Sequence, residues 1–155
     1  MINLRENQIF NEENVLICTE IINKEEIILK LVTLLKEKGF LDNESDFLSS
    51  IYDRESRGTT YVSSNLAIPH GFTDSVKKPS LAIARIIKPI QWDMQEHLVS
   101  LVIMFAFPEI TTGVEREMEI LSKVARSLGN NELVEKLMAG RSEQEIIKTL
   151  KLAVL

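Results

Sequence analysis

Seven consecutive apolar residues, Leu101 to Phe107, constrain the fold of this 155-residue chain more than any other feature. A strand with one face in water alternates apolar and polar side chains, and this run shows no such alternation. Pro108 follows directly and marks the end of a strand, because proline cannot donate a ladder hydrogen bond. The run therefore predicts a central β-strand buried on both faces, which requires helices on both sides of the sheet.

Shorter apolar segments predict further strands of the same sheet. Two of them precede the central run and are, like it, short and bounded by prolines, which is typical of buried strands. The predicted strands between residues 61 and 107 are 66–68, 81–87 and 98–107. Val15 to Cys18 forms another apolar strand near the start of the chain.

Helical periodicity with capping residues surrounds these strands. Asn23, with Glu26 three residues later, begins an amphipathic helix that ends at Gly39. Further helices are predicted after Asp42-Asn43 as far as about Gly58, from Val114 to Leu128, from Asn130 or Asn131 through Met138, and from the Ser142–Glu145 capping box onward. The sequence thus predicts a single α/β domain over residues 1–155, a sandwich whose central mixed β-sheet is covered by helices on both faces.

Charge and composition argue against several classes of function. A formal net charge of −5 argues against nucleic acid as a partner, because phosphate backbones demand clustered lysine and arginine. The first ten residues lack the pattern of a signal peptide, and the longest apolar run is too short to span a bilayer, so we expect a cytoplasmic protein. Cys18 is the only cysteine, which rules out an internal disulfide and a cysteine-based zinc site.

The pentapeptide Ala67-Ile68-Pro69-His70-Gly71 places a histidine where a short apolar strand should end. Proline fixes φ and lacks a backbone donor, whereas glycine adopts conformations closed to other residues. Imidazole has an ordinary pKa of about 6.5, so it is mostly uncharged at pH 7 and is a good nucleophile. Two interpretations follow: His70 presents a nucleophile at the rim of the sheet, or it is an ordinary histidine satisfied by its neighbours.

The rest of the sequence argues against a metal site and a cofactor site. His70 and His97 form no metal-binding spacing, so we predict no metal. The chain has no glycine-rich phosphate loop, dinucleotide fingerprint or nucleophile elbow, so we expect no cofactor.

Arg54 stands sixteen positions before His70 at the end of a helix, and guanidinium groups recognise phosphate through planar, charge-assisted hydrogen bonds. The pair indicates phosphoryl transfer, with a solvated helix-end cation as the alternative for Arg54.

The segment from Arg54 to Thr60, followed by Leu66 to Gly71, resembles the IIA components of the sugar phosphotransferase system of the fructose and mannitol type. Residues 76–85 and 119–125 share this resemblance, which covers nearly the whole chain. It implies that His70 accepts a phosphoryl group on Nε2 from phosphorylated HPr. It also implies that a cysteine of a separate IIB component, which serves the membrane component IIC, receives the group. The implied site needs no metal or cofactor, and Arg54 and the Thr60 hydroxyl stabilise the phosphoryl charge there.

Two departures from the family pattern bear on this site. Glu117 stands where relatives often carry a second histidine, and an ionised carboxylate close to a phosphoryl group would repel it. We expect Glu117 either to orient the imidazole through Nδ1 or to face away as a solvated helix residue. Ser63-Ser64-Asn65 stands where many relatives have glycine, and its side chains would either donate to phosphate or shape a turn.

Three functional classes follow from the sequence. The leading one is a phosphocarrier for sugar uptake. The second is a regulatory phosphoprotein of the same fold, of the nitrogen-related IIA type or associated with a transcription regulator, in which phosphorylation changes partner binding. The third is a binding domain that has lost the chemistry; Glu117 favours it, whereas the presence of both His70 and Arg54 argues against it.

Overall fold

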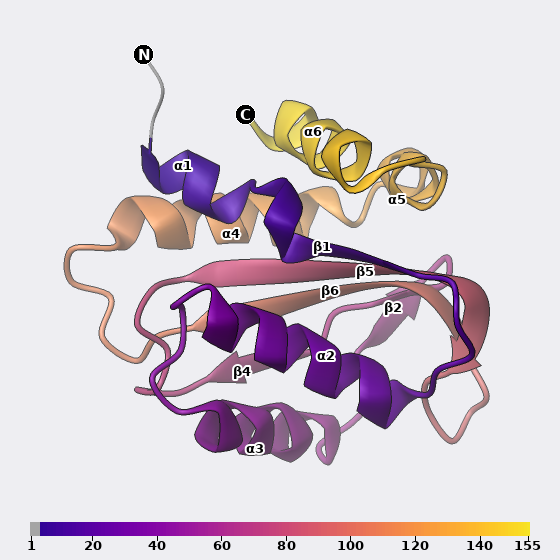
Figure 1. The fold of residues 1–155 in the computed structure, drawn as a ribbon, viewed down its shortest axis with the longest axis horizontal. Helices are drawn as coiled ribbons and strands as arrows, with labels where there is room; N and C mark the ends of the chain where they lie inside the picture. Colours follow the sequence, from indigo (N-terminus) through magenta and orange to yellow (C-terminus); the bar gives the residue numbers. More distant parts are fainter. Residues whose placement is uncertain (1–3) are drawn as a thin grey trace.

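The computed structural model describes residues 4–155, so the first three residues of the N-terminal segment considered above lie outside it. Within the described residues, one six-stranded sheet lies between two layers of helices (Figure 1). The helices are α1 (Leu4–Ile9), the short 3-10 helix η1 (Glu12–Asn14), α2 (Lys24–Glu37), α3 (Glu44–Glu55), α4 (Glu115–Ser127), α5 (Asn131–Met138) and α6 (Glu143–Val154). The strands are β1 (Val15–Cys18), β2 (Tyr61–Ser63), β3 (Leu66–Ala67), β4 (His70–Phe72), β5 (Ser80–Gln91) and β6 (Leu98–Phe107).

The sheet is mixed, as predicted. Its strand order is β1-β5-β6-β3-β2, and β4 also pairs with β6. The long strands β5 and β6 are antiparallel, whereas β1 lies parallel to β5, and β3 and β4 lie parallel to β6. All residues from Leu101 to Ala106 are buried, which confirms the central position predicted for this apolar run.

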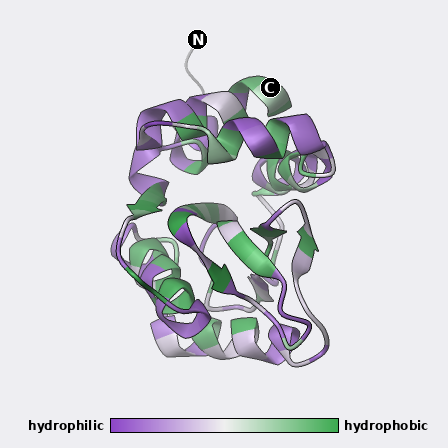
Figure 2. Ribbon diagram, turned by 90° about the vertical axis from the view of Figure 1, so that its right-hand side faces the viewer, coloured by the Kyte–Doolittle hydropathy of each residue, from purple (hydrophilic) through white to green (hydrophobic). Residues whose placement is uncertain are grey.

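Helices cover both faces of the sheet, as the apolar run required. The helices α2 and α3 pack on one face, and α1, α4, α5 and α6 pack on the other (Figures 1 and 2). Successive side chains of a strand point to opposite faces. Ala82 and Ala84 therefore join the core under α2 and α3, whereas Leu81 and Ile83 join the other core. We call these two sides the α3 face and the α4 face.

Capping side chains set the starts of four helices. The side chains of Asn23, Asn43, Asn130 and Ser142 each accept a hydrogen bond from a backbone amide in the first helical turn. These are the starts that the sequence predicted. The sequence did not predict α1, because six residues are too few to show a helical period.

Strand β5 extends further than predicted. The prediction ended this strand at Ile87, whereas β5 continues to Gln91. The register with β6 shifts between Arg85 and Ile90, and the exposed Pro89 lies within this irregular stretch. A sheet tolerates proline at such a position because the regular ladder, which needs every amide proton, is already interrupted there.

Candidate functional site

His70 lies on a strand that proline interrupts but does not end. Strand β3 ends at Ala67, one residue before the predicted end at Ile68, but the chain resumes as β4, and both pair with β6 at the same offset. The Pro69 carbonyl accepts a hydrogen bond from the Phe105 amide at 3.0 Å, which continues the ladder across the break. The prediction that the strand simply stops at this motif is therefore wrong. His70 begins the second half of one interrupted strand.

The backbone occupies one nitrogen of the His70 imidazole. Nδ1 lies 3.0 Å from the carbonyl oxygen of Ile68. Because a carbonyl can only accept a hydrogen bond, Nδ1 carries the proton, and Nε2 of the neutral ring holds a lone pair. The side chain is half-buried, and among the described strands β4 pairs with β6 alone, so His70 lies at an edge of the sheet. Nε2 is thus the nucleophilic nitrogen.

The sheet register assigns His70 to the α4 face. His70 lies opposite Phe105, whose side chain belongs to the core under α4, and opposite residues of paired strands point to the same face. The next residue, Gly71, points to α3. A methyl group on Gly71 would lie 2.3 Å from Ser50 Oγ and 2.7 Å from Phe47 Cε1. Glycine therefore lets β4 lie directly against α3 while its neighbour turns the imidazole to the other side.

Gly71→Ala is expected to lower the free energy of unfolding by about 1–3 kcal/mol, because overpacking forces side chains or backbone to shift. Urea unfolding of the purified variant measures this change. Gly129→Ala is a matched control, since its added methyl group would lie 3.4 Å from its nearest contact, the Arg126 carbonyl oxygen. Equal unfolding free energies for the two variants would contradict the close contact of β4 with α3.

Glu117 also lies on the α4 face. It occupies the side of α4 that carries the buried residues Ile120 and Val124, and it is 8% exposed. Its carboxylate pairs with Arg5 of α1 at 3.4 Å. The expectation of a solvated helix residue is therefore wrong. The orienting bond to Nδ1, the other expectation for Glu117, comes instead from the Ile68 carbonyl.

Arg54 lies in the last turn of α3. It follows Ser50 by four residues, so it shares the side of the helix that contacts Gly71. Its Nη1 donates a hydrogen bond to the Gly58 carbonyl at 2.9 Å, and its side chain is half-buried. A guanidinium has five N–H donors, so this bond anchors the group to the loop after α3 and leaves donors for an anion.

Thr60 is buried, and two side chains engage its hydroxyl. The hydroxyl donates a short hydrogen bond to Glu55 Oε1 and accepts one from the Trp92 indole Nε1 at 3.1 Å. Its single proton is therefore committed to Glu55. The direct donor role that the resemblance implies would require this bond to break, and in the present arrangement Thr60 supports the loop that follows Arg54.

The Ser63-Ser64-Asn65 segment forms the turn between β2 and β3. Ser64 and Asn65 have positive φ angles of 52° and 65°, a conformation that glycine adopts most easily. Their side chains bond to Asn131 and to the Leu98 carbonyl. Of the two expectations for this segment, the structure favours the turn.

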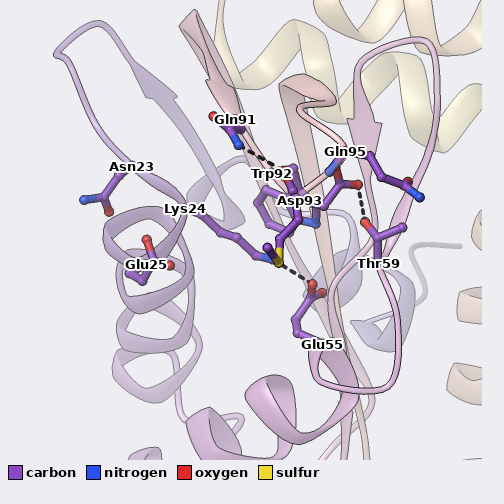
Figure 3. A pocket seen from close by; sticks show the side chains of 10 residues that line it. Asn23, Lys24, Glu25, Glu55, Thr59, Gln91, Trp92, Asp93 and Gln95 are labelled. Carbon is purple, nitrogen blue, oxygen red and sulfur yellow. Dashed lines mark hydrogen bonds and ion pairs between the residues drawn. The ribbon is translucent and has the colours of Figure 1, made fainter.

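A cleft of about 540 Å³ lies beside the end of α3 and the loop that follows it, where Glu55 and Thr59 line it (Figure 3). His70 does not line this cleft. Lys24 Nζ binds Glu55 Oε2 at 2.8 Å and lies 4.6 Å from the centre of the Trp92 ring. No role for Glu55 was predicted from the sequence. A single acidic residue at a helix end does not reveal its partner, and Lys24 lies 31 residues away.

Asp93 lines the cleft next to Trp92. Its Oδ2 accepts hydrogen bonds from the Thr59 hydroxyl and from His97 Nδ1, both at 2.7 Å. Desolvation alone would raise the pKa of Asp93, but the hydrogen bonds from His97 and Thr59 outweigh it and lower the pKa to about 2. The ring of His97 also stacks on Tyr61, with centroids 4.0 Å apart. His97 thus has a structural role, because it holds Asp93 in place beside the cleft.

Two kinds of feature are missing from residues 4–155. No group of three or more histidine, cysteine, aspartate or glutamate residues in this part of the chain could hold a metal ion. No helix in the same range is long and apolar enough to cross a membrane.

Sequence comparison relates the chain to one family. The family model described as phosphoenolpyruvate-dependent sugar phosphotransferase system, EIIA 2, matches residues 8–153. The mannitol-specific phosphotransferase enzyme IIA component of Halalkalibacterium halodurans is 34% identical over 146 residues, which cover 92% of this chain and 94% of that protein. The PTS system 2-O-alpha-mannosyl-D-glycerate-specific EIIABC component of Escherichia coli K12 is 30% identical over 130 residues, or 83% of this chain. The aligned part is about a fifth (20%) of that relative's length.

Solved structures share the fold. The nitrogen regulatory protein IIA-Ntr from Neisseria meningitidis superposes with a TM-score of 0.75 and 27% identity, over 90% of this chain and 94% of that one. Enzyme IIAMtl from Escherichia coli, solved in complex with phosphorylated enzyme IIBMtl, superposes with a TM-score of 0.72 and 21% identity, over 90% and 95% of the two chains. The second similarity concerns the fold alone.

Proposed function

The chain belongs to the EIIA 2 family of the phosphoenolpyruvate-dependent sugar phosphotransferase system, and we propose that His70 is its transient phosphohistidine. In this proposal phosphorylated HPr supplies the phosphoryl group, and a cysteine of a separate IIB component receives it for sugar uptake through the membrane component IIC. The observation that carries the proposal is the bond between His70 Nδ1 and the Ile68 carbonyl. That bond leaves the Nε2 lone pair free at the edge of the sheet.

The transfer balances without a further reactant. The Nε2 lone pair attacks the phosphorus of phospho-HPr, a new P–N bond forms, and the bond to the HPr imidazole breaks with its electron pair returning to that ring. The Nδ1 proton of His70 stays on its nitrogen throughout. Its hydrogen bond to the Ile68 carbonyl stabilises the positive charge that the phosphorylated ring carries.

Other residues would complete the site through charge and position. Arg54 binds the phosphoryl oxygens as they approach Nε2, since its guanidinium keeps free donors beside the Gly58 bond. Thr60 assists by holding the loop that follows Arg54. Glu117 stays paired with Arg5, which offsets the carboxylate charge that would otherwise repel the phosphoryl group.

The acceptor cysteine comes from another polypeptide in this proposal. Cys18, the only cysteine of the sequence, is 4% exposed, and burial raises the pKa of its thiol. A buried thiol of raised pKa is a poor nucleophile. The solved complex of IIAMtl with phosphorylated IIBMtl supports a IIB protein as the partner.

A two-stage assay tests the relay. The protein is incubated with enzyme I, HPr and labelled phosphoenolpyruvate, and the label is mapped by mass spectrometry. A IIB protein of the fructose or mannitol type is then added. We expect acid-labile label on His70 and its discharge to the IIB cysteine. If the wild-type protein gains no label, the carrier function is wrong and the non-catalytic class is favoured.

The similarity to IIA-Ntr, at 27% identity, favours a regulatory phosphoprotein as the second candidate. This candidate predicts the same first stage and a different second one. His70 would gain the label, but none of the IIB proteins would remove it, and phosphorylation would instead change the affinity for a regulatory partner. The discharge step therefore separates the two candidates.

A further inference from the structure

Four side chains beside the cleft form a buried cluster that takes no direct part in the transfer chemistry. They are Lys24, Glu55, Thr60 and Trp92, and we call them the Glu55 cluster. Figure 3 shows Lys24 and Trp92 converging with Glu55 on one wall of the cleft. The Glu55 side chain is 6% exposed, and that of Lys24 is 17% exposed. Two charged groups are thus largely removed from water.

Each polar group of the cluster has a partner. Glu55 Oε2 binds Lys24 Nζ, and Glu55 Oε1 accepts a hydrogen bond from the Thr60 hydroxyl. The same hydroxyl accepts a hydrogen bond from Trp92 Nε1. Burying a carboxylate is costly unless its oxygens are bonded, so removal of a single partner is strongly unfavourable. The cluster therefore holds Thr60 in one position against α2 and the end of β5.

Thr60 is connected to His70 through a single residue. The Thr60 carbonyl accepts a hydrogen bond from the Ile68 amide at 3.0 Å. The Ile68 carbonyl in turn accepts a hydrogen bond from His70 Nδ1 at 3.0 Å. Pro69 follows Ile68 and restricts its backbone, so the position of Thr60 sets the direction of the Ile68 carbonyl. That direction decides which ring nitrogen of His70 keeps its lone pair.

Arg54 is connected to the same cluster through the chain. It precedes Glu55 directly in the last turn of α3, and its guanidinium bonds to Gly58 in the loop that leads to Thr60. Glu55 and Thr60 close that loop with their hydrogen bond. The buried hydrogen bond between Glu55 and Thr60 thus links Arg54, which precedes Glu55, to the backbone that orients His70.

We propose that the Glu55 cluster positions both His70 and Arg54 for phosphoryl transfer, with the Thr60 hydroxyl as its central member. This inference rests on the proposed function of His70. In this proposal the cluster acts through His70 and Arg54 and does not itself bind the phosphoryl group, so its members are positioning residues. Their loss should slow the transfer step and leave docking of the donor intact.

Thr60→Val and Thr60→Ser test this proposal as a pair. Valine has the shape of threonine without the hydroxyl, whereas serine keeps the hydroxyl. Since misplacement of reacting groups lowers the rate of the chemical step, we expect Thr60→Val to lower kcat for transfer from phospho-HPr about tenfold, with KM changed less than about twofold. Thr60→Ser should stay near the wild-type rate. Glu20→Gln is the control, because it removes an exposed ion pair with Lys30.

A second readout uses the unphosphorylated protein. Nitrogen-15 NMR of His70 in the wild-type protein should show a protonated Nδ1 and an unprotonated Nε2. In Thr60→Val we expect a measurable fraction of the ring with the proton on Nε2, and in Thr60→Ser none. If Thr60→Val does not fold, Trp92→Phe takes its place, because it removes the indole donor and keeps an aromatic ring.

The outcomes separate the two proposals. Thr60→Val with the wild-type ring state and the wild-type kcat would overturn the positioning role, and so would a rise in KM alone, which would indicate docking. If the wild-type protein takes no label from HPr, the carrier function fails. The ring state of His70 in the variants still decides whether the Glu55 cluster orients the imidazole.

Discussion

Replacing His70 by alanine is expected to abolish acid-labile phosphorylation, with label at the level of the blank. In the proposed transfer Nε2 of His70 forms the P–N bond, and the Ile68 carbonyl already holds the other nitrogen. Alanine removes the nucleophile, and no neighbouring group of the described structure replaces an imidazole at this edge of the sheet. Because His70 is only half-buried, the variant should fold like the wild-type protein. Incubation with enzyme I, HPr and labelled phosphoenolpyruvate measures the loss.

His97→Ala is the matched control, since His97 is the only other histidine of the chain. Its Nδ1 binds Asp93, which lines the cleft, and its ring stacks on Tyr61, so its contacts are structural. We expect this variant to take up label like the wild-type protein. Label retained by His70→Ala and lost from His97→Ala would contradict the assignment of the phosphorylated residue.

Arg54→Ala should lower the rate of phosphoryl transfer by about 10²-fold, the usual cost of removing one preorganised donor from a developing negative charge. Arg54 follows Ser50, the α3 residue beside Gly71, by one helical turn, and its guanidinium donates a hydrogen bond to the Gly58 carbonyl at 2.9 Å. Arg54→Lys should recover part of the rate, because lysine restores the charge without the planar pair of donors. Rapid-quench measurement of single-turnover transfer from phospho-HPr gives this rate directly.

Arg57→Ala distinguishes a local role from a general effect of positive charge. Arg57 lies in the loop after α3, next to Gly58, but its side chain is 70% exposed and pairs with Asp53 at 2.6 Å. Exposed ion pairs of this kind contribute little to stability. We expect the rate of this variant to stay within about twofold of wild type, since a distant exposed charge is screened by salt. Similar losses for Arg54→Ala and Arg57→Ala would contradict a specific phosphate-binding role.

The layers of the fold could be predicted because they depend on patterns within short segments. The unbroken apolar run from Leu101 to Phe107 indicated a central strand, and capping residues such as Asn23 and Ser142 marked helix starts. The predictions that were wrong concern where two strands end, because pairing with a neighbouring strand decides this. Strand β5 runs through Pro89, and β4 resumes after Pro69, since β6 supplies hydrogen bonds on both sides of each interruption.

The sequence by itself determined which residues could carry the chemistry: a histidine after Ile68-Pro69, and an arginine at a helix end before it. Only the tertiary structure decided which distant residues hold the side chains of this region in place. Glu117 is buried beside Arg5, 112 residues away in sequence, and Glu55 binds Lys24, 31 residues away. Local periodicity and propensity report only on neighbours along the chain. The free Nε2 of His70 depends on a loop held in place by Thr60 and Trp92, which meet only in the folded protein.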